Sequence, residues 1–250
     1  MYNVAVILAG GIGARVGGST PKQLLPLSDG HSVLEHAVNA FEQSLHIQEV
    51  CIVMHPDYIA HAEQMLLANA WQKVRHIIPG GKERWESSVN AIRQFIGEGV
   101  DIRYPISDTR KTTNLLLHDA ARPFVSQEII ARVCEALKEH EAVTVAIPST
   151  DTVYEMADGQ VARIPQRSTI MRAQTPQAFR LPLIAEAYAR ALSPDTRYPI
   201  SDIRYPQEGV ACHLPATDDC GTVHEYMPHI PIHIVLGEEQ NKKITIKEDI

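Results

Sequence analysis

The sequence predicts an α/β protein with one mostly parallel sheet, helices on both faces and a projecting β-arm. Short aliphatic runs alternate along the chain with longer segments whose apolar residues recur at helical spacing. The aliphatic runs hold few polar residues, which is typical of parallel strands buried on both faces. After Pro148 the pattern changes to short extended segments around a turn, which predicts a β-ribbon outside the sheet.

The elements are expected in the alternating order that such a sheet requires. Strands are predicted at 4–9, 50–54, 74–78, 115–117, 142–147, 232–236 and 244–246. Helices are predicted at 32–44, 57–68, 82–95, 126–140 and 181–192. Ser32 and Glu35 have the spacing of a capping box, and Ser126 is expected to cap the helix that follows it.

We expect one domain over residues 1–250, with residues 150–173 as the β-arm around the Asp158-Gly159 turn. Residues 247–250 have the pattern of a helix that is just beginning, so a closing helix or a further domain beyond residue 250 is an expectation. The hexapeptide RYPISD occurs at 103–108 and again at 197–202, and both copies are predicted to be surface loops.

The charge and the apolar pattern limit the partners. The net charge of -7 argues against duplex nucleic acid or an anionic membrane as a partner. No apolar run approaches the length of a membrane span. The chain enters a strand directly, without the pattern of a secretory signal, and its four cysteines form no C-x-x-C pair. A cytoplasmic location is therefore expected.

The first strand runs into a long glycine-rich loop that also carries Arg15 and Lys22. Glycine allows positive φ and a close approach of the backbone to a ligand, and successive N–H groups in such a loop bind anions. The loop glycines are Gly10, Gly11, Gly13, Gly17 and Gly18. Two cations among them indicate a polyphosphate ligand, whereas a purely structural turn is the less favoured alternative.

Two common phosphate-binding loops do not fit this stretch. A Walker loop has Gly-Lys followed by Ser or Thr, but here Lys22 lies between Pro21 and Gln23. A dinucleotide fingerprint needs a third glycine where Val16 stands, and it needs a helix that Pro21 and Pro26 forbid. A long basic glycine loop after the first strand is instead typical of sugar nucleotidyltransferases.

Polar motifs follow three of the predicted strands. The glycine loop follows the first strand, Gly80-Gly81 follows the third, and His118-Asp119 ends the strand at 115–117. Ligands of parallel sheets bind beyond the carboxyl ends of the strands. We therefore expect the three motifs to form one binding site.

Seven motifs occur in an order that resembles one known family. They are LAGGxGxR with TPKQ, GGxxR, HDAARP, an arm with Asp-Thr, QTPQxF, TDD and NxKxT. The chain is similar over nearly its whole length to the family of 2-C-methyl-D-erythritol 4-phosphate cytidylyltransferase and ribitol 5-phosphate cytidylyltransferase. The resemblance implies a Rossmann-like nucleotidyltransferase fold, Mg²⁺ dependence, and a homodimer in which each β-arm reaches the partner's active site.

The implied reaction joins CMP from CTP to a polyol phosphate and releases pyrophosphate, so catalysis depends on positioning and electrostatics. By resemblance, Lys22 contacts the α-phosphate, Arg15 the triphosphate and Lys243 the phosphates. Asp119 matches the metal-linked aspartate, and Asp218 is a second candidate metal ligand that fits an N-cap equally well. The nucleotide-binding set comprises Leu8, Ala9, Gly10, Gly11, Gly13, Gly81, Arg84, Ser87, Asp119 and Ala120. The substrate-binding set comprises Arg122, Thr152, Arg167, Asp218 and Thr245.

Two polyol phosphates fit the resemblance. Leu8 to Gly13 and the TDDCG sequence from Thr217 look more like the ribitol-phosphate branch, so the sequence favours D-ribitol 5-phosphate. The alternative substrate is 2-C-methyl-D-erythritol 4-phosphate, of isoprenoid biosynthesis. An NAD(P)-binding oxidoreductase domain is a remote alternative, because Lys22 would have no function in an NAD(P)-binding site. A catalytically silent binding subunit is disfavoured because the site cations are retained.

Overall fold

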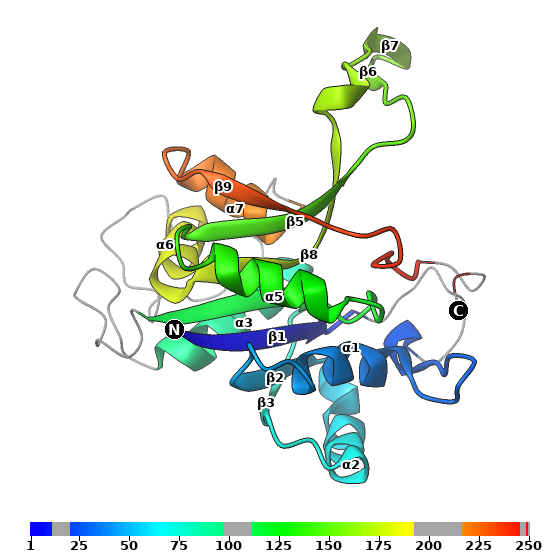
Figure 1. The fold of residues 1–250 in the computed structure, drawn as a ribbon, viewed down its shortest axis with the longest axis vertical. Coiled ribbons are helices and arrows are strands. Elements are labelled where there is room, and N and C mark those ends of the chain that lie inside the picture. The colour runs from blue at the N-terminus through cyan, green and yellow to red at the C-terminus, as the bar shows by residue number, and fades with distance from the viewer. Residues whose placement is uncertain (12–20, 98–111, 193–216, 246–248, 250) are drawn as a thin grey trace.

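Seven strands form one sheet in the order β3-β2-β1-β4-β8-β5-β9 (Figure 1). The computed structural model describes residues 1–11, 21–97, 112–192, 217–245 and 249. The strands are β1 (Tyr2–Ala9), β2 (Glu49–Met54), β3 (Val74–Pro79), β4 (Thr113–Asp119), β5 (Ala142–Pro148), β8 (Met171–Arg180) and β9 (Ile232–Leu236). All pairings are parallel except the two that β8 makes with β4 and β5. The expected Rossmann-like, mostly parallel fold is confirmed.

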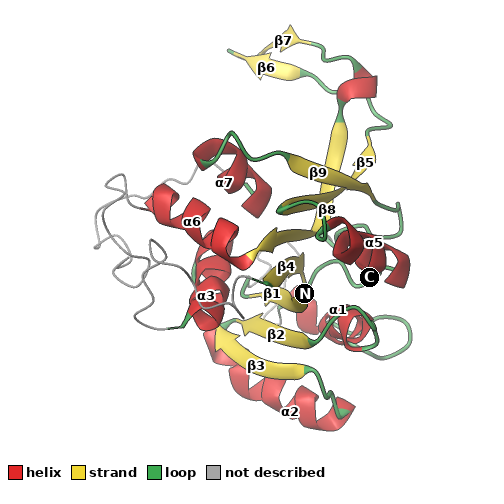
Figure 2. Cartoon of the chain, turned by 60° about the vertical axis from the view of Figure 1, so that its left-hand side comes forward, coloured by secondary structure: helices red, strands yellow, loops and turns green. Residues whose placement is uncertain are grey.

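Helices cover both faces of the sheet (Figure 2). The helices α1 (Val33–Glu42), α2 (Ile59–Asn69) and α5 (Gln127–Ala136) pack on one face. The helices α3 (Arg84–Ile96), α6 (Leu181–Leu192) and α7 (Asp219–Tyr226) pack on the other. Short 3-10 turns lie at Lys22–Leu24, Pro56–Tyr58 and Arg167–Thr169.

The aliphatic run of β1 shows why the sheet takes helices on both sides. Successive side chains of a strand point to opposite faces. Ile7 packs among α1, α2 and α5, whereas Val6 packs among α3, α6 and α7. Both side chains are fully buried. A strand buried on both faces can be apolar at every position, as β1 is from Val4 to Ala9.

The predicted boundaries hold closely at the first helix. The Ser32 side chain accepts from the backbone N–H of Glu35, and the Glu35 carboxylate accepts from the N–H of Ser32, so the capping box is confirmed. Ser126 caps α5 as predicted, but the helix ends at Ala136 instead of 140. The strand predicted at 244–246 is absent at Ile244 and Thr245, and position 246 lies outside the described residues.

The β-arm projects from the sheet and ends in a small ribbon of β6 (Glu155–Ala157) and β7 (Gln160–Arg163). The predicted turn is present, with positive φ at Asp158 and Gly159. The arm was predicted to end at about residue 173, and the structure continues it directly into β8, a single strand over residues 171–180. This strand enters the main sheet antiparallel between β4 and β5.

Both copies of the RYPISD repeat, together with Gly13 and Arg15, lie outside the described residues. Among the helices that the structure does describe, none combines the length and the apolarity that crossing a bilayer requires.

Candidate active site

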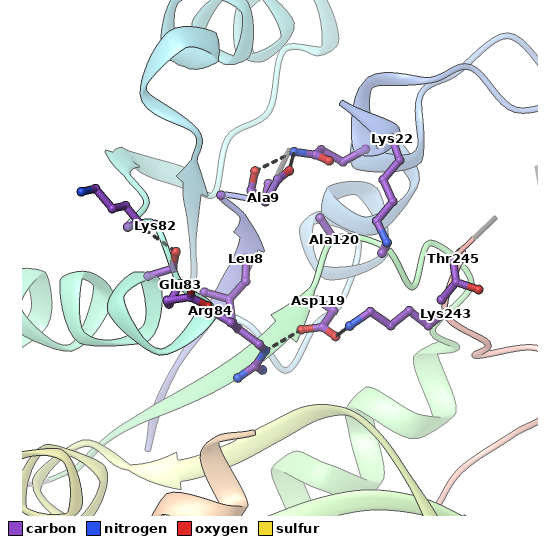
Figure 3. A pocket seen from close by; sticks show the side chains of 16 residues that line it. Leu8, Ala9, Lys22, Lys82, Glu83, Arg84, Asp119, Ala120, Lys243 and Thr245 are labelled. Carbon is purple, nitrogen blue, oxygen red and sulfur yellow. Dashed lines mark hydrogen bonds and ion pairs between the residues drawn. The ribbon is translucent and has the colours of Figure 1, made fainter. Parts of the chain in front are cut away.

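A pocket of about 510 Å³ opens at the carboxyl ends of β1 and β4, beside the start of α3 (Figure 3). It is the place that a mostly parallel sheet offers to a ligand. Polar and charged side chains line it together with glycines. The lining residues are Leu8, Ala9, Gly10, Gly11, Lys22, Gln23, Gly81, Lys82, Glu83, Arg84, Ser87, Asp119, Ala120, Ala121, Lys243 and Thr245.

The two glycine turns touch each other at the floor of the pocket. A Cβ placed on Gly80 would lie 2.9 Å from the Cα of Gly10, and a Cβ on Gly10 would lie 2.8 Å from Ser87 Oγ. Neither position has room for a side chain. Ser87 Oγ accepts from the backbone N–H of Gly81 at 3.1 Å. Glycine is therefore required here by the close approach of the two turns.

Gln23 holds the start of the glycine loop. Its side-chain amide nitrogen donates to the carbonyl oxygens of Ala9, at 2.7 Å, and of Gly11, at 2.8 Å. The side chain is buried, with 2% of the residue exposed. One amide group thus orients the carbonyl groups of Ala9 and Gly11, the two residues that flank Gly10 and line the pocket with it.

We expect Gln23→Glu to weaken the binding of CTP, the nucleotide that the resemblance implies, by at least ~10-fold. The change replaces a double donor with an acceptor that faces two carbonyl oxygens, and a buried unsatisfied polar group costs about 1–3 kcal/mol. Isothermal titration calorimetry would measure the affinity. The control is Gln64→Glu on the exposed surface of α2, which should bind CTP like the parent protein. Equal affinity in both variants would contradict a positioning role for Gln23.

Asp119 lies at the centre of the charged side chains. Its Oδ1 accepts from Arg84 Nε at 3.0 Å, and its Oδ2 pairs with Lys243 Nζ at 2.7 Å. Burial alone would raise the pKa of this carboxyl, but the charges of Arg84 and Lys243 hold the pKa well below its usual range. Asp119 is therefore ionised throughout the physiological pH range.

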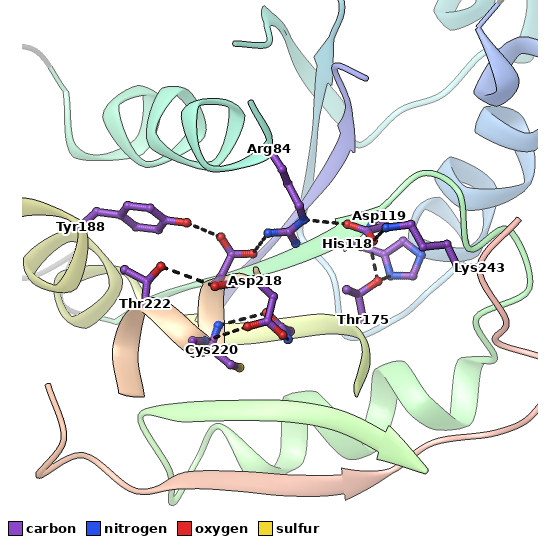
Figure 4. A network of polar contacts seen from close by, with 12 residues as sticks. Arg84, His118, Asp119, Thr175, Tyr188, Asp218, Cys220, Thr222 and Lys243 are labelled. Carbon is purple, nitrogen blue, oxygen red and sulfur yellow. Dashed lines mark hydrogen bonds and ion pairs between the residues drawn. The ribbon is translucent and has the colours of Figure 1, made fainter. Parts of the chain in front are cut away.

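Arg84 connects Asp119 to a second, deeper carboxylate (Figure 4). Arg84 Nη1 pairs with Asp219 Oδ2 at 2.7 Å, and Tyr188 Oη donates to Asp219 Oδ1 at 2.7 Å. Burial acts to lower the pKa of Arg84, yet the two carboxylates keep the pKa above its ordinary value. Burial and the Asp219 charge raise the pKa of Tyr188. Arg84 stays charged, and Tyr188 stays a neutral donor.

His118 and Thr175 fix the backbone on both sides of Asp119. Burial lowers the pKa of His118 to about 4, so its ring is neutral at physiological pH. Its Nε2 lies 2.9 Å from the carbonyl oxygen of Arg122 and must carry the proton, which leaves Nδ1 to accept from Thr175 Oγ1 at 3.0 Å. Thr175 Oγ1 in turn accepts from the Asp119 N–H at 3.1 Å. Donors and acceptors can be assigned in only one way along this chain of hydrogen bonds, in which Thr175 supports the backbone at Asp119.

The segment after β9 passes across one side of the pocket. Lys22 Nζ donates to the carbonyl oxygen of Ile244 at 2.8 Å, and the N–H of Ile244 donates to the carbonyl of Ala121 at 2.8 Å. Asn241 is fully buried and donates to the carbonyl of Thr175 at 2.9 Å. Figure 3 shows Lys22 and Lys243, from opposite ends of the chain, on the same flank of the pocket.

The structure brings most of the predicted site residues together. Those that line the pocket are Leu8, Ala9, Gly10, Gly11, Lys22, Gly81, Arg84, Ser87, Asp119, Ala120, Lys243 and Thr245. Thr245 also donates from its N–H to Asp249 Oδ2 at 2.8 Å, and its Oγ1 lies 3.1 Å from the same oxygen. No structural statement is made for Gly13 and Arg15, which fall outside the described residues.

Four predicted substrate-binding residues lie elsewhere. The Arg122 guanidinium donates to the carbonyls of Asn241 and Ala173, at 2.8 and 3.2 Å, and Arg122 does not line the pocket. Asp218 is the N-cap of α7: Oδ1 accepts from the N–H of Gly221 and Oδ2 from the side chain of Gln177. Thr152 and Arg167 are exposed on the β-arm. In this structure Arg122 and Asp218 bind groups of the protein itself, and the substrate-binding role of all four residues stays a prediction.

Among the described residues that line the pocket, Asp119 and Glu83 carry a carboxylate, and the Glu83 side chain accepts from the backbone N–H of Glu86 in the capping box of α3. Among the described residues, no group of three or more His, Cys, Asp or Glu side chains is arranged to hold a metal ion. Mg²⁺ commonly binds one or two carboxylates and completes its octahedron with substrate phosphates and water. Asp119 fits that mode, with the remaining ligands supplied by a nucleotide. Asp218 does not, since both of its oxygens accept hydrogen bonds away from the pocket.

Sequence reasoning missed Gln23, Tyr188 and Asp219. Gln23 is part of the TPKQ motif, and its signal was its place directly after Lys22. Asp219 stands next to Asp218, and adjacent aspartates at a helix start look alike in a sequence. Tyr188 lies in a helix whose apolar pattern marks it only as a core residue.

A pocket lined by three lysines, Lys22, Lys82 and Lys243, and made by glycine turns at the carboxyl edge of this sheet is the kind of site that a nucleotidyltransferase uses. The family model described as 2-C-methyl-D-erythritol 4-phosphate cytidylyltransferase matches residues 3–250. The chain therefore belongs to that family of cytidylyltransferases, and the family expected from the motifs is confirmed.

Three similar proteins illustrate the match. The 2-C-methyl-D-erythritol 4-phosphate cytidylyltransferase of Thermobifida fusca is 40% identical over 98% of this chain and 89% of its own. The Haemophilus influenzae bifunctional ribulose 5-phosphate reductase/CDP-ribitol pyrophosphorylase Bcs1 is 34% identical over 99% of this chain and 46% of its own. The crystal structure of 4-diphosphocytidyl-2C-methyl-D-erythritolsynthase from Anaerococcus prevotii has a TM-score of 0.74 at 26% identity, covering 99% of this chain and 92% of that one.

Proposed function

We propose that this cytidylyltransferase joins CMP from CTP to 2-C-methyl-D-erythritol 4-phosphate and releases pyrophosphate. The observation that carries the choice of substrate is the match over nearly the full chain to the family model and to the T. fusca relative that bear this name. D-Ribitol 5-phosphate, which the sequence favoured, has the support of the bifunctional H. influenzae relative. The comparisons thus favour the alternative over the first choice.

The reaction needs little proton transfer. A phosphate monoester has its second pKa near 6, so its oxygen is already an anionic nucleophile at neutral pH. That oxygen forms a bond to the α-phosphorus of CTP while the bond from this phosphorus to the bridging oxygen of the β-phosphate breaks. Negative charge spreads over the oxygens in transit, and fixed cations stabilise it. Lys22 and Lys243, with Arg15, are the cations assigned to this task.

Asp119 would hold Mg²⁺, and the ion would supply positive charge that offsets the negative charge of the phosphates. Lys243 Nζ and Asp119 Oδ2 lie 2.7 Å apart, so the two groups compensate each other while the pocket holds no triphosphate. Lys22 Nζ donates to the neutral carbonyl oxygen of Ile244. Both ammonium groups are thus held at the pocket, where they could contact the phosphates of CTP.

The β-arm fits a homodimer in which Thr152 and Arg167 serve the partner's site. The arm exposes Tyr154, Met156, Val161 and Ile164, each at least half exposed. A two-stranded ribbon has marginal stability alone, and grouped apolar side chains favour contact with another surface. A second copy of the arm is the simplest such surface.

Pyrophosphate release from a substrate matrix tests the proposal. CTP, UTP and ATP would each be paired with 2-C-methyl-D-erythritol 4-phosphate and with D-ribitol 5-phosphate. We expect CTP with the erythritol phosphate to give the highest kcat/KM, because backbone groups that pair with cytosine remain unpaired with other bases. Preference for ribitol phosphate would reverse the substrate assignment. Equal turnover of ATP would contradict cytosine recognition.

A further inference from the structure

The Asp219 carboxylate is fully buried and does not line the pocket. It lies in the first turn of α7, where Tyr188 of α6 donates to Oδ1 and Arg84 of α3 pairs with Oδ2, both at 2.7 Å. A buried charge is costly unless it is paired and hydrogen-bonded. A buried ion pair is also often replaceable by apolar residues without loss of stability. Stability alone therefore does not explain why a carboxylate is buried at position 219.

The explanation lies in how Arg84 divides its donors. A guanidinium commonly binds one carboxylate through two parallel N–H groups. Here Nε goes to Asp119 and Nη1 goes to Asp219. The Nη2 atom is buried and has no hydrogen-bond partner in the part of the chain that the structure describes. Asp119 therefore receives only one donor from Arg84, as Figure 4 shows.

The second oxygen of Asp119 is the one that faces the rest of the site. It pairs with Lys243 Nζ at 2.7 Å, and Lys243 lines the pocket. A two-donor contact from Arg84 would occupy both oxygens of Asp119. The four charges of Arg84, Lys243, Asp119 and Asp219 balance, and loss of the buried anion would leave Asp119 between two cations.

We propose that Asp219 is a positioning residue: by holding Arg84, it keeps the second oxygen of Asp119 available to Lys243 and to a bound nucleotide with its metal ion. Tyr188 assists by occupying Oδ1 of Asp219, which directs Oδ2 to Arg84. Neither residue touches the pocket, so both act through Arg84. The activity readouts below rest on the proposed function, whereas the structural readout does not.

Asp219→Asn should lower kcat by about 10–100-fold, the usual effect of losing a group that orients a metal ligand. The KM for CTP should change far less, because the backbone at Gly10 and Gly81 is untouched. Tyr188→Phe keeps the Asp219 charge and should lower kcat in the same direction by a smaller factor. The control is Glu186→Gln, which removes a carboxylate from the exposed side of α6 and should leave kcat unchanged.

A double-mutant cycle tests whether Asp219 acts through Arg84. Arg84→Met alone should reduce kcat, and adding Asp219→Asn should reduce it no further, because the group through which Asp219 acts is gone. Effects that multiply would overturn the proposal. Thermal unfolding of each variant would show whether it is folded. If Asp219→Asn does not fold, the same cycle is measured with Tyr188→Phe in its place.

A crystal structure of Asp219→Asn gives a readout that needs no activity. We expect two N–H groups of Arg84 on Asp119 and a longer distance from Asp119 Oδ2 to Lys243 Nζ than 2.7 Å. An unchanged Arg84 would refute the positioning role. If the parent enzyme turned over neither polyol phosphate, the proposed function would fail, while this structural test would still stand.

Discussion

Lys22→Ala is expected to lower kcat by at least ~100-fold, the typical cost of one lost electrostatic contact to a transition state. Lys22 lines the pocket, and its ammonium group is held by the Ile244 carbonyl at 2.8 Å. A charge held at that place is available to the phosphate on which negative charge accumulates. The measurement is steady-state kinetics of pyrophosphate release at saturating CTP.

Lys73→Ala is the matched control. Lys73 Nζ also donates to a backbone carbonyl, that of Ser44, but it lies outside the pocket. Both substitutions remove a hydrogen bond from a lysine ammonium group to a backbone carbonyl, so a much larger loss of kcat in Lys22→Ala is expected from a catalytic role. Near-normal turnover of Lys22→Ala, or an equal loss in both variants, would refute the assignment of Lys22.

Arg167→Ala is expected to lower kcat/KM by at least ~10-fold, since a hydrogen bond to a charged group contributes about 1.5–3 kcal/mol. Arg167 is exposed on the β-arm and does not line the pocket of its own chain. If it serves the partner's pocket, mixing Arg167→Ala with Lys22→Ala should restore activity. Each mixed dimer then has one site with both defects and one intact site, so up to about half of the parent activity returns.

Arg163→Ala provides the comparison for the arm. Arg163 lies on the same ribbon and pairs with Glu155 at 3.2 Å. Its loss should leave kcat/KM near the parent value and should neither require nor provide complementation. If subunits exchange and the mixture of Arg167→Ala with Lys22→Ala stays inactive, Arg167 does not act across a dimer.

Local sequence signals predicted most of the fold, and long-range pairing decided the rest. The capping box at Ser32 and Glu35 and the glycine turn at Gly159 depend on neighbours within a few residues, and both were found. Strand β8 was missed because its QTPQ segment is polar and contains Pro176. Gln174 and Gln177 are buried there by β4 and β5, so the tertiary surroundings override the local preference.

The same division applies to the site. Asp119 and Lys22 stand in motifs at strand ends, so the sequence located them. The pairing of Asp119 with Lys243 joins residues 124 positions apart and is visible only in the structure. Asp218 and Asp219 differ in role because consecutive residues of a helix start point in different directions. One caps the helix, and the other turns inward to Arg84.

The place of β8 has a consequence for the nascent chain. The strands β1 to β4 pair among themselves, so a four-stranded sheet can form once residue 119 has left the ribosome. The strand β5 emerges next, but its described ladder partners are β8 and β9, both of which follow it. Strand β5 can therefore join the sheet only after β8 has been synthesised and has paired between β4 and β5. We therefore expect co-translational folding in two stages, with the exposed edge of β4 as the surface that chaperones protect between them.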